Sequence, residues 1–241
     1  MSSGDKGTRN MQQETRDCAR GSGMGGSAAQ PLFSELAEED INYFAGRGHI
    51  ATYPKGELII REGERSDHMY VILSGRVRVF ANNSNGRKII LNIQEAGEYF
   101  GEIALIDESP RSASVETLEK SVLSRLSRKD FEKCLDERPD LAGSFLSALT
   151  LRIRYLTHSV KNLALNDVYH RVVYTLEKLA EDIDGERAIK IPLTHRDIAQ
   201  MVGSSREMVT KLMKELQNRR CIEIRRKHRI VLLRPFPESL S

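Results

Sequence analysis

Short hydrophobic runs separated by glycines fill the stretch from His49 to Ser127, and they constrain the fold more than any other feature of the sequence. Examples of the runs are Leu58–Ile60, Met69–Leu73, Val77–Phe80, Ile89–Ile93, Ser114–Thr117 and Val122–Leu126, and the glycines are Gly56, Gly63, Gly75, Gly86 and Gly97. Many short, evenly spaced β runs predict a sandwich or a barrel. Asn85-Gly86 lies between two of the runs and predicts a tight hairpin. We therefore expect an all-β domain here.

The pattern changes to helix-forming residues from Pro139 onward. Apolar residues recur there at steps of three or four: Phe145, Leu149, Ile153, Leu156, Val160 and Leu163. This stripe predicts one long helix with two open interpretations, a seam with a second copy of the chain or a helix packed on its own barrel. Asn166-Asp167 interrupts the stripe, and Asp167 is a good N-cap for a new helix through Ala180. We expect the interdomain hinge at this point.

Residues 1–30 are rich in Gly and Ser and have almost no apolar periodicity, which predicts a disordered tail. Leu32 to Phe44 has the spacing of a short amphipathic helix. No apolar run approaches the roughly 18 residues of a membrane span, and Met1 to Gln30 lacks the apolar core of a secretory signal. We therefore expect a cytoplasmic protein with no membrane partner.

Charge is unevenly distributed along the chain. The segment from Arg187 to Arg234 has a net charge of +9, whereas the whole chain has +3, so the remainder sums to −6. A compact basic segment on an acidic body indicates either a module that binds a polyanion or a solvated charged surface.

The three cysteines, Cys18, Cys134 and Cys221, lie far apart. Neither a CxxC pair nor a Cys/His spacing indicates zinc or an iron–sulfur cluster, so we expect free, reduced thiols and no metal. No nucleophile–base pair is recognisable either. An enzyme is therefore not expected.

The run from Phe100 to Val115 contains residues suited to a small phosphate ligand. Gly101 permits close approach of the backbone, and the following turn exposes N–H groups at a helix start. Arg111 offers a fixed-charge fork for phosphate oxygens, and Ser112 adds a hydroxyl. Glu102 repels phosphate but suits ribose hydroxyl donors. From the residues alone, an ion pair between Arg111 and Glu102 is an equally good interpretation.

A helix-turn-helix layout follows in the basic segment. Thr194 and Asp197 form a capping box, and Gly203 supplies a tight turn before Ser204 or Ser205 caps a second helix. Val209, Leu212, Met213 and Leu216 mark the buried face of that second helix. A generic pair of helices is the alternative interpretation. In a DNA-reading motif, the N-terminal residues of the second helix contact base edges in the major groove.

Both segments resemble a known family. The run FGEIALIDESPRSASV resembles the phosphate-binding cassette of cyclic-nucleotide-binding domains, and YPKGELIIREGE and MYVILSGRVRVF resemble strands of the same barrel. VGSSREMVTKLMKEL resembles the recognition-helix segment of the catabolite-activator family, and Cys221 to Leu233 resembles the basic β-wing behind it. The chain is thus similar, over about residues 31–234, to the cyclic-AMP receptor (CRP/FNR) family of bacterial transcription regulators.

The resemblance implies roles for residues of the first motif. Glu102 is expected to bind the ribose 2′-hydroxyl, and Arg111 with Ser112 to neutralise the cyclic phosphate. The other expected pocket residues are Val79, Leu91, Asn92, Gly101, Ile103, Ala104, Arg152 and Thr157. Where the family has two hydroxyl residues for adenine, this chain has Leu156-Thr157, which leaves the nucleotide open. Arg152 has a second interpretation as a solvated helix-surface residue.

The resemblance also implies DNA contacts. The expected residues are Thr194, His195, Arg196, Ser204, Ser205, Arg206, Glu207, Thr210 and Lys211. Arg206, Glu207 and Lys211 match the family's base-contacting positions, except that Lys211 replaces an arginine and lacks its planar fork. His195, Arg196 and the stretch from Arg225 to Arg229 are expected to bind DNA phosphates.

The expected fold is α+β: a disordered tail (residues 1–30), a jelly-roll-like cyclic-nucleotide-binding β-barrel (31–136), a dimerisation helix and hinge (137–166), and a winged helix-turn-helix (167–241). The expected function is a homodimeric, cyclic-nucleotide-responsive transcription regulator on a pseudo-palindromic operator. Cyclic AMP is the first expected effector and cyclic GMP the second; double-stranded DNA and RNA polymerase are the expected partners. Two alternatives remain, a regulator of the same fold with a different effector, and a nucleotide-binding module that controls a protein partner.

Overall fold

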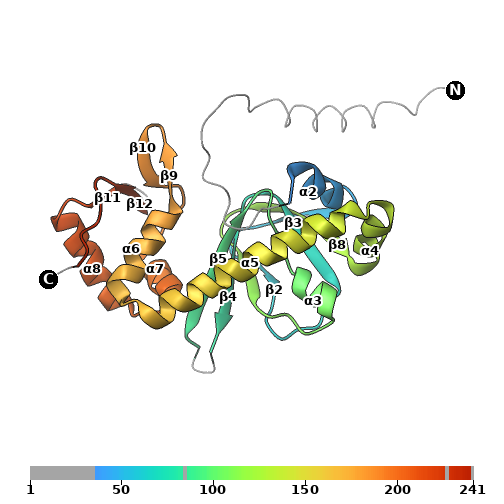
Figure 1. Cartoon of the computed structure of the whole chain (residues 1–241), viewed down its shortest axis with the longest axis horizontal. Coiled ribbons are helices and arrows are strands. Elements are labelled where there is room, and N and C mark those ends of the chain that lie inside the picture. Colours follow the sequence, from blue (N-terminus) through green and yellow to red (C-terminus); the bar gives the residue numbers. More distant parts are fainter. Residues whose placement is uncertain (1–35, 84–85, 226–227, 240–241) are drawn as a thin grey trace.

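The protein is described by a computed structural model that covers residues 36–83, 86–225 and 228–239. Figure 1 shows a β-rich half, a smaller C-terminal half, and one long helix that runs along the first and reaches the second. The expected mixed α and β fold is confirmed. The expected tail, Cys18 and the start of the first predicted helix lie outside the described residues.

The β-rich half consists of two four-stranded antiparallel sheets. One has the strand order β1-β8-β3-β6 and the other β2-β7-β4-β5. The strands are β1 (His49–Tyr53), β2 (Leu58–Ile60), β3 (His68–Ser74), β4 (Arg76–Asn82), β5 (Lys88–Glu95), β6 (Tyr99–Phe100), β7 (Ser114–Thr117) and β8 (Ser121–Ser127). The helices are α2 (Glu38–Ala45), α3 (Glu102–Asp107) and α4 (Arg128–Glu137).

The predicted hairpin is formed by β4 and β5, which pair from Arg76 with Glu95 to Asn82 with Lys88. Asn85 of its expected turn lies outside the described residues. Gly75 makes the preceding connection, from β3 to β4, with φ of 90°. A side chain at Gly75 would also meet Ser121 Oγ at 2.4 Å, so this turn requires glycine.

An aromatic cluster attaches the helices to the barrel. Phe44 of α2 stacks on Phe131 of α4 with ring centroids 5.5 Å apart, and Phe145 of the long helix packs edge-on against Phe131 at 5.4 Å. All three rings are buried together with Met69 and Leu126 of the barrel. Burial of such rings is a major part of what holds this half together.

The long helix, α5 (Asp140–Leu165), divides into two parts. In its first part Phe145 is 5% exposed and belongs to the barrel core. In its second part Ile153, Leu156, Val160 and Leu163 are 43–64% exposed. The interpretation as a helix packed on its own barrel is therefore right for the first part. In the second part Leu156 and Leu163 share a cavity with residues of β5, whereas Ile153 and Val160 are each 64% exposed.

The predicted break after the long helix is present. Asn166 ends α5, and the side chain of Asp167 accepts a hydrogen bond from the backbone N–H of His170 at 2.9 Å, which caps α6 (Val168–Leu179). The C-terminal half then adds α7 (His195–Val202), α8 (Arg206–Asn218), and a sheet of order β11-β12-β10-β9. Its strands are β9 (Ala180–Ile183), β10 (Glu186–Ile189), β11 (Ile222–Arg225) and β12 (Arg229–Leu232).

The two halves touch through the β4–β5 hairpin. Ile93 of β5 packs against the core of the C-terminal half. Arg78 of β4 lies 3.7 Å from a carboxylate oxygen of Asp197 in α7, and Lys190 Nζ lies 3.5 Å from Glu95. The hairpin therefore connects the barrel to the first helix of the helix-turn-helix.

None of the described helices is long and apolar enough to cross a membrane. Within the same residues, no group of three His, Cys, Asp or Glu side chains is placed to hold a metal ion. Cys134 and Cys221 are buried free thiols.

Candidate functional site

Gly101 forms the entrance to a small concave site on the barrel. It is the N-cap of α3 and has φ of 83°. A Cβ atom built on Gly101 would lie 2.7 Å from Nη1 of Arg111 and 3.0 Å from Ile60 Cδ1. Glycine is thus required both by the left-handed backbone and by the close approach of Arg111.

Arg111 is 4% exposed and bonded to neutral groups. Its Nη1 donates to the carbonyl oxygen of Gly101 at 2.6 Å, and its Nη2 donates to Ser66 Oγ at 2.7 Å and to the carbonyl oxygen of His68 at 2.5 Å. Burial lowers the pKa of the guanidinium from its usual value. Among the described residues no carboxylate pairs with Arg111, which contradicts the interpretation as an Arg111–Glu102 ion pair.

The carboxylate of Glu102 is paired with another residue, Arg152 of the long helix. Arg152 Nη1 lies 2.5 Å from Glu102 Oε1, and Glu102 is 1% exposed. Its second oxygen, Oε2, is buried and accepts no hydrogen bond. A buried acceptor of this kind is costly unless a donor reaches it, and a ribose hydroxyl is such a donor. The residues present therefore fit a sugar next to an anion.

These groups line a cavity of about 30 Å³, which is large enough for about two water molecules. The lining includes eight of the expected residues: Val79, Gly101, Glu102, Ile103, Ala104, Arg111, Ser112 and Arg152. It also includes Ile60, Phe100, Ala113 and Val115, which the sequence reasoning missed. Phe100, Ala113 and Val115 belong to the quoted run from Phe100 to Val115, so their place in that run was the available signal, whereas Ile60 lies in β2, outside it. We call this cavity the cradle.

Three expected residues lie outside the cradle in the single chain. Leu91 and Asn92 of β5 line a separate cavity against the second part of α5. Thr157 is exposed, and its hydroxyl donates to the carbonyl oxygen of Ile153 at 2.9 Å. The reason is geometric: α5 crosses β5 beyond the cradle, and the side chain of Arg152 is the one that reaches back to Glu102.

The helix-turn-helix has the expected caps. Thr194 and Asp197 form a reciprocal capping box at the start of α7, and Gly203 ends α7 with φ of 64°. Of the two candidate caps for α8, Ser205 accepts the hydrogen bond, from Met208 N at 3.2 Å. Val209, Met213 and Leu216 are buried and Leu212 is partly buried, as predicted.

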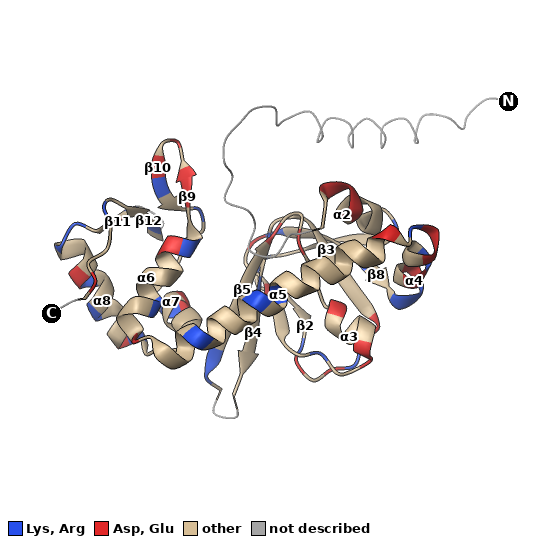
Figure 2. Cartoon of the chain, in the orientation of Figure 1, with Lys and Arg blue, Asp and Glu red and all other residues tan. Residues whose placement is uncertain are grey.

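The opposite face of α8 presents the predicted DNA-reading residues. Ser205, Arg206, Glu207, Thr210 and Lys211 are all exposed, and Ser204 is partly exposed. His195 of α7 lies beside them, with Nδ1 3.1 Å from Thr210 Oγ1. Thr194, His195, Arg196 and Arg206 also line one surface hollow together with His228. Figure 2 shows acidic residues on α2 and both basic and acidic residues on α4 and α8.

Electrostatics distinguish two of the basic residues near this face. The pKa of His195 is lowered, first by burial and then by the nearby charges of Arg206 and His228. Arg225 forms a two-pronged contact with Glu186 at 2.7 and 3.0 Å and also bonds to Glu223, which raises its pKa. Arg225 is therefore engaged by carboxylates in the single chain, and its expected contact with DNA phosphates stays a prediction.

Comparison with known proteins decides the family. The family model for the cyclic nucleotide-binding domain matches residues 50–138, and that for the Crp-like helix-turn-helix domain matches residues 170–236. A cAMP-activated global transcriptional regulator of Haemophilus influenzae is 32% identical over 186 residues, which cover 76% of this chain and 83% of the relative. The chain belongs to the CRP/FNR family.

Further relatives and solved structures are similar to this chain. A CRP-like cAMP-activated regulator of Mycobacterium tuberculosis is 30% identical, and the match covers 71% of this chain and 79% of the relative. Among solved structures, the c-di-GMP-responsive regulator CLP of Xanthomonas campestris aligns with a TM-score of 0.71 at 23% identity, covering 83% of this chain and all of that chain. A CRP/FNR regulator of Thermus thermophilus aligns with a TM-score of 0.64 at 25% identity, covering 77% of this chain and 94% of that chain.

The match of both domains makes this CRP/FNR chain a cyclic-nucleotide-binding transcription regulator. Family membership places the cradle in the domain that takes the nucleotide, and α7 with α8 in the domain that takes DNA. The family is one of DNA-binding transcription regulators and not of enzymes.

Proposed function

We propose that the chain is a homodimeric regulator whose affinity for a pseudo-palindromic operator depends on a cyclic nucleotide, with cyclic AMP as the first effector and cyclic GMP as the second. The observation that carries the proposal is the cradle: a buried guanidinium lies near a buried carboxylate oxygen that still needs a donor. One site for an anion beside one site for a hydroxyl corresponds to a phosphate attached to its own ribose.

Different cradle residues would bind the phosphate and the ribose of the ligand. Arg111 has five N–H donors and uses three of them on Gly101, Ser66 and His68, which leaves two for phosphate oxygens. Ser112 and the backbone N–H groups of Ile103 and Ala104 would complete the phosphate site. Glu102 Oε2 would accept the ribose 2′-hydroxyl, and the side chain of Val79 would contact the sugar.

Nucleotide entry would require the cradle to open. A cavity of about 30 Å³ is far below the roughly 300 Å³ of the smallest pockets that hold drug-sized ligands. The side chain of Arg152 is the expected mobile part, because it comes from α5 and bonds to Glu102 inside the cradle. Leu91, Asn92 and Thr157 remain proposed contacts of the base, Thr157 through the second subunit.

The exposed stripe of α5 supports a homodimer. Ile153, Leu156, Val160 and Leu163 follow the heptad spacing of a two-stranded seam, and all are at least 43% exposed. We propose that the same four residues of a second chain cover them. The unit would then consist of the barrel (31–136), the dimerisation helix and hinge (137–166) and the DNA-binding domain (167–241).

A two-fold dimer presents two copies of α8 to DNA. Recognition helices about 34 Å apart read two half-sites one helical turn apart, hence the pseudo-palindrome. Arg206, Glu207 and Lys211 would contact bases, with Ser205 and Thr210 beside them. Thr194, His195, Arg196 and Ser204 would contact phosphates. RNA polymerase is the further proposed partner, and the cytoplasm is the proposed compartment because the DNA lies there.

Calorimetric titration of the full chain with cyclic AMP, cyclic GMP and cyclic di-GMP tests the effector. We expect cyclic AMP to bind most tightly and Arg111→Ala to lose affinity by about 100-fold, since a charge-assisted pair of hydrogen bonds is removed. Arg128→Ala is the matched control, because Arg128 pairs with Glu108 outside the cradle. Equal nucleotide affinities of Arg111→Ala and the parent chain would show that the cradle is not the nucleotide site.

An effector outside the cyclic mononucleotides is the second candidate. The departure at Leu156-Thr157 and the small cradle favour it, and one structural neighbour is described as c-di-GMP-responsive. Tight binding of cyclic di-GMP with no binding of cyclic AMP or cyclic GMP would select this candidate.

A further inference from the structure

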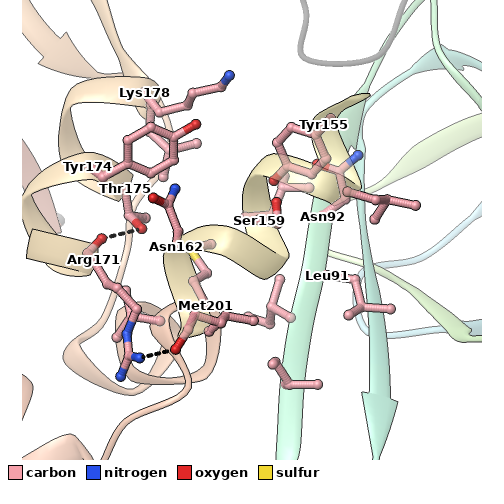
Figure 3. Close-up of a pocket in the computed structure, with 17 residues that line it drawn as sticks. Leu91, Asn92, Tyr155, Ser159, Asn162, Arg171, Tyr174, Thr175, Lys178 and Met201 are labelled. Atoms are coloured by element: carbon pink, nitrogen blue, oxygen red, sulfur yellow. Dashed lines mark hydrogen bonds between the residues drawn. The ribbon is translucent and has the colours of Figure 1, made fainter. Parts of the chain in front are cut away.

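A second cavity, of about 160 Å³, lies where the barrel meets the DNA-binding domain. Its walls come from β5, from the second part of α5, and from α6 and α7, as Figure 3 shows. We call it the hinge cavity. In the single chain it shares no lining residue with the cradle, although Leu91 and Asn92, proposed above as contacts of the nucleotide base, lie in its wall.

The lining of the hinge cavity is mostly apolar. Its apolar members are Ile89, Ile90, Leu91, Ile93, Leu156, Leu163, Leu179, Met201 and Val202. Ligand sites in proteins are typically lined in this way, with a few polar groups, and they occur preferentially between domains. An apolar cavity of about 150 Å³ admits one benzene ring, which sets the size of the occupant's apolar body.

The polar groups of the hinge cavity are neutral or positive. Asn92, Ser159, Asn162 and Thr175 supply amides and hydroxyls, Tyr155 and Tyr174 supply phenols, and Arg171 and Lys178 supply charge. Among the residues described, no Asp or Glu lines this cavity. An anionic group is therefore the complement of its polar wall.

Lys178, an exposed residue, is one of the two cations on this wall that can meet the anion. Its Nζ lies 5.5 Å from the centroid of Tyr155 and 5.9 Å from that of Tyr174, and no carboxylate of the described residues pairs with it. Arg171 is engaged only in part: its Nη1 donates to the carbonyl oxygens of Leu163 and Asn166 at 3.1 and 3.4 Å, whereas its Nε is buried without a hydrogen-bond partner. Figure 3 shows Lys178 on the same side of the cavity as Tyr174.

We propose that the hinge cavity binds a small monocarboxylate whose apolar body is about one aromatic ring in size, with its carboxylate at Lys178. The ring would rest on the leucine and isoleucine side chains of β5 and α5. Because β5 belongs to the barrel and α6 to the DNA-binding domain, such a ligand contacts both domains at once. The proposal does not depend on which nucleotide the cradle takes.

Thermal melting of the full chain with three probes tests the proposal. Benzoate carries the ring and the charge, benzyl alcohol the ring alone, and acetate the charge alone. We expect benzoate at about ten times its Kd to raise the Tm by about 3 °C, benzyl alcohol to raise it less, and acetate not to raise it. If benzoate does not change the Tm, the proposal is wrong. This outcome is also expected if a second copy of the chain fills the cavity.

Variants then locate the probe. Lys178→Gln removes the charge and should weaken benzoate binding by about fivefold without changing benzyl alcohol binding. Thr175→Leu fills the cavity and should abolish both shifts, whereas Arg111→Ala in the cradle should keep the benzoate shift. A benzoate shift that survives in both Lys178→Gln and Thr175→Leu overturns the site, and equal shifts for benzoate and benzyl alcohol in the parent chain overturn the carboxylate.

Discussion

The fit between Gly101 and Arg111 is the tightest residue-level feature of the cradle. Gly101 requires glycine because of its φ of 83° and because a Cβ would press on Arg111. Gly97 has a similar φ of 88°, but a Cβ there would meet nothing within 4 Å. Comparing an alanine substitution at Gly97 with one at Gly101 therefore distinguishes the effect of backbone strain from the effect of displacing the Arg111 guanidinium.

We predict that Gly101→Ala and Gly97→Ala both destabilise the fold, by about 1 kcal/mol from the positive φ, with a further loss in Gly101→Ala from the clash. Gly101→Ala alone should weaken nucleotide binding, by about tenfold or more, because Arg111 must move. Urea unfolding and calorimetric titration measure the two effects. Normal nucleotide affinity in Gly101→Ala would mean that the guanidinium position does not matter.

The lowered pKa of His195 gives a second residue-level prediction. Because the folded state disfavours its protonated form, the unfolded state binds more protons as the pH falls below about 6.5. The contribution of His195 to stability is thus complete above this pH and is lost towards the lower, folded-state pKa. We expect urea unfolding to show this loss, at less than about 1.4 kcal/mol per pH unit, and His195→Gln not to show it. DNA phosphates favour the protonated form, so DNA affinity should change in the opposite direction.

The chemistry of the cradle was predictable from single residues, but its partners were not. Gly101, Glu102 and Arg111 stand in one short run, and their residue types already define an anion site beside a hydroxyl site. That Glu102 pairs with Arg152, fifty positions away, depends on where α5 crosses the barrel. The same crossing places Leu91 and Asn92 in the hinge cavity.

At the scale of elements, α5 combines two roles that its sequence stripe does not separate. A period of three or four residues marks one face of a helix and does not say what covers it. The structure shows that the barrel covers Phe145, whereas Ile153 and Val160 are each 64% exposed. The second half of the stripe is where a dimer must form if the proposal is right.

We predict that Ile153→Glu converts the protein to monomers, because it places a charge in the centre of the proposed apolar seam. Leu165→Glu is the matched control: Leu165 is 80% exposed, lies on α5, and stands off the stripe. Sedimentation velocity at micromolar concentration distinguishes the two. Dimers in Ile153→Glu would exclude this face as the seam.

Several elements were absent from the sequence predictions, and the β9–β10 hairpin and α4 each had a local signal. The β9–β10 hairpin turns at Asp184-Gly185, and both residues have positive φ, as a two-residue hairpin turn requires. Its strands are charged and four residues long, so they lack clear alternation. Helix α4 begins at Arg128, and its N-cap Ser127, whose hydroxyl accepts a hydrogen bond from Asp130 N, is also the last residue of strand β8.

At the scale of the whole molecule, a line of contacts connects the cradle to the helix-turn-helix. Strand β7 begins directly after the cradle residues Arg111 to Ala113, and its Glu116 accepts from Arg78 at 3.0 Å. The same Arg78 reaches Asp197, which is part of the capping box of α7. A ligand that binds more tightly to one packing of these groups would increase the population of that packing, and with it one arrangement of the barrel relative to the DNA-binding domain.

We predict that Arg78→Gln reduces the effect of nucleotide on DNA affinity by about 0.5–2 kcal/mol while nucleotide affinity itself changes little. Arg76→Gln is the matched control, because Arg76 lies on the same strand and pairs with Glu119, a residue of the barrel half rather than of the DNA-binding domain. Fluorescence anisotropy with labelled DNA, with and without nucleotide, measures this coupling. Equal coupling in both variants would show that the contact with Asp197 carries no signal.

The central claim is that an occupied cradle changes how the chain binds DNA. Its most direct test is the Kd of the full chain for a duplex selected from random sequence, measured by anisotropy with and without saturating cyclic AMP. We predict at least about fivefold tighter binding with the nucleotide, and no change in Arg111→Ala. An identical Kd in both conditions, with calorimetry showing the nucleotide bound, would contradict the account.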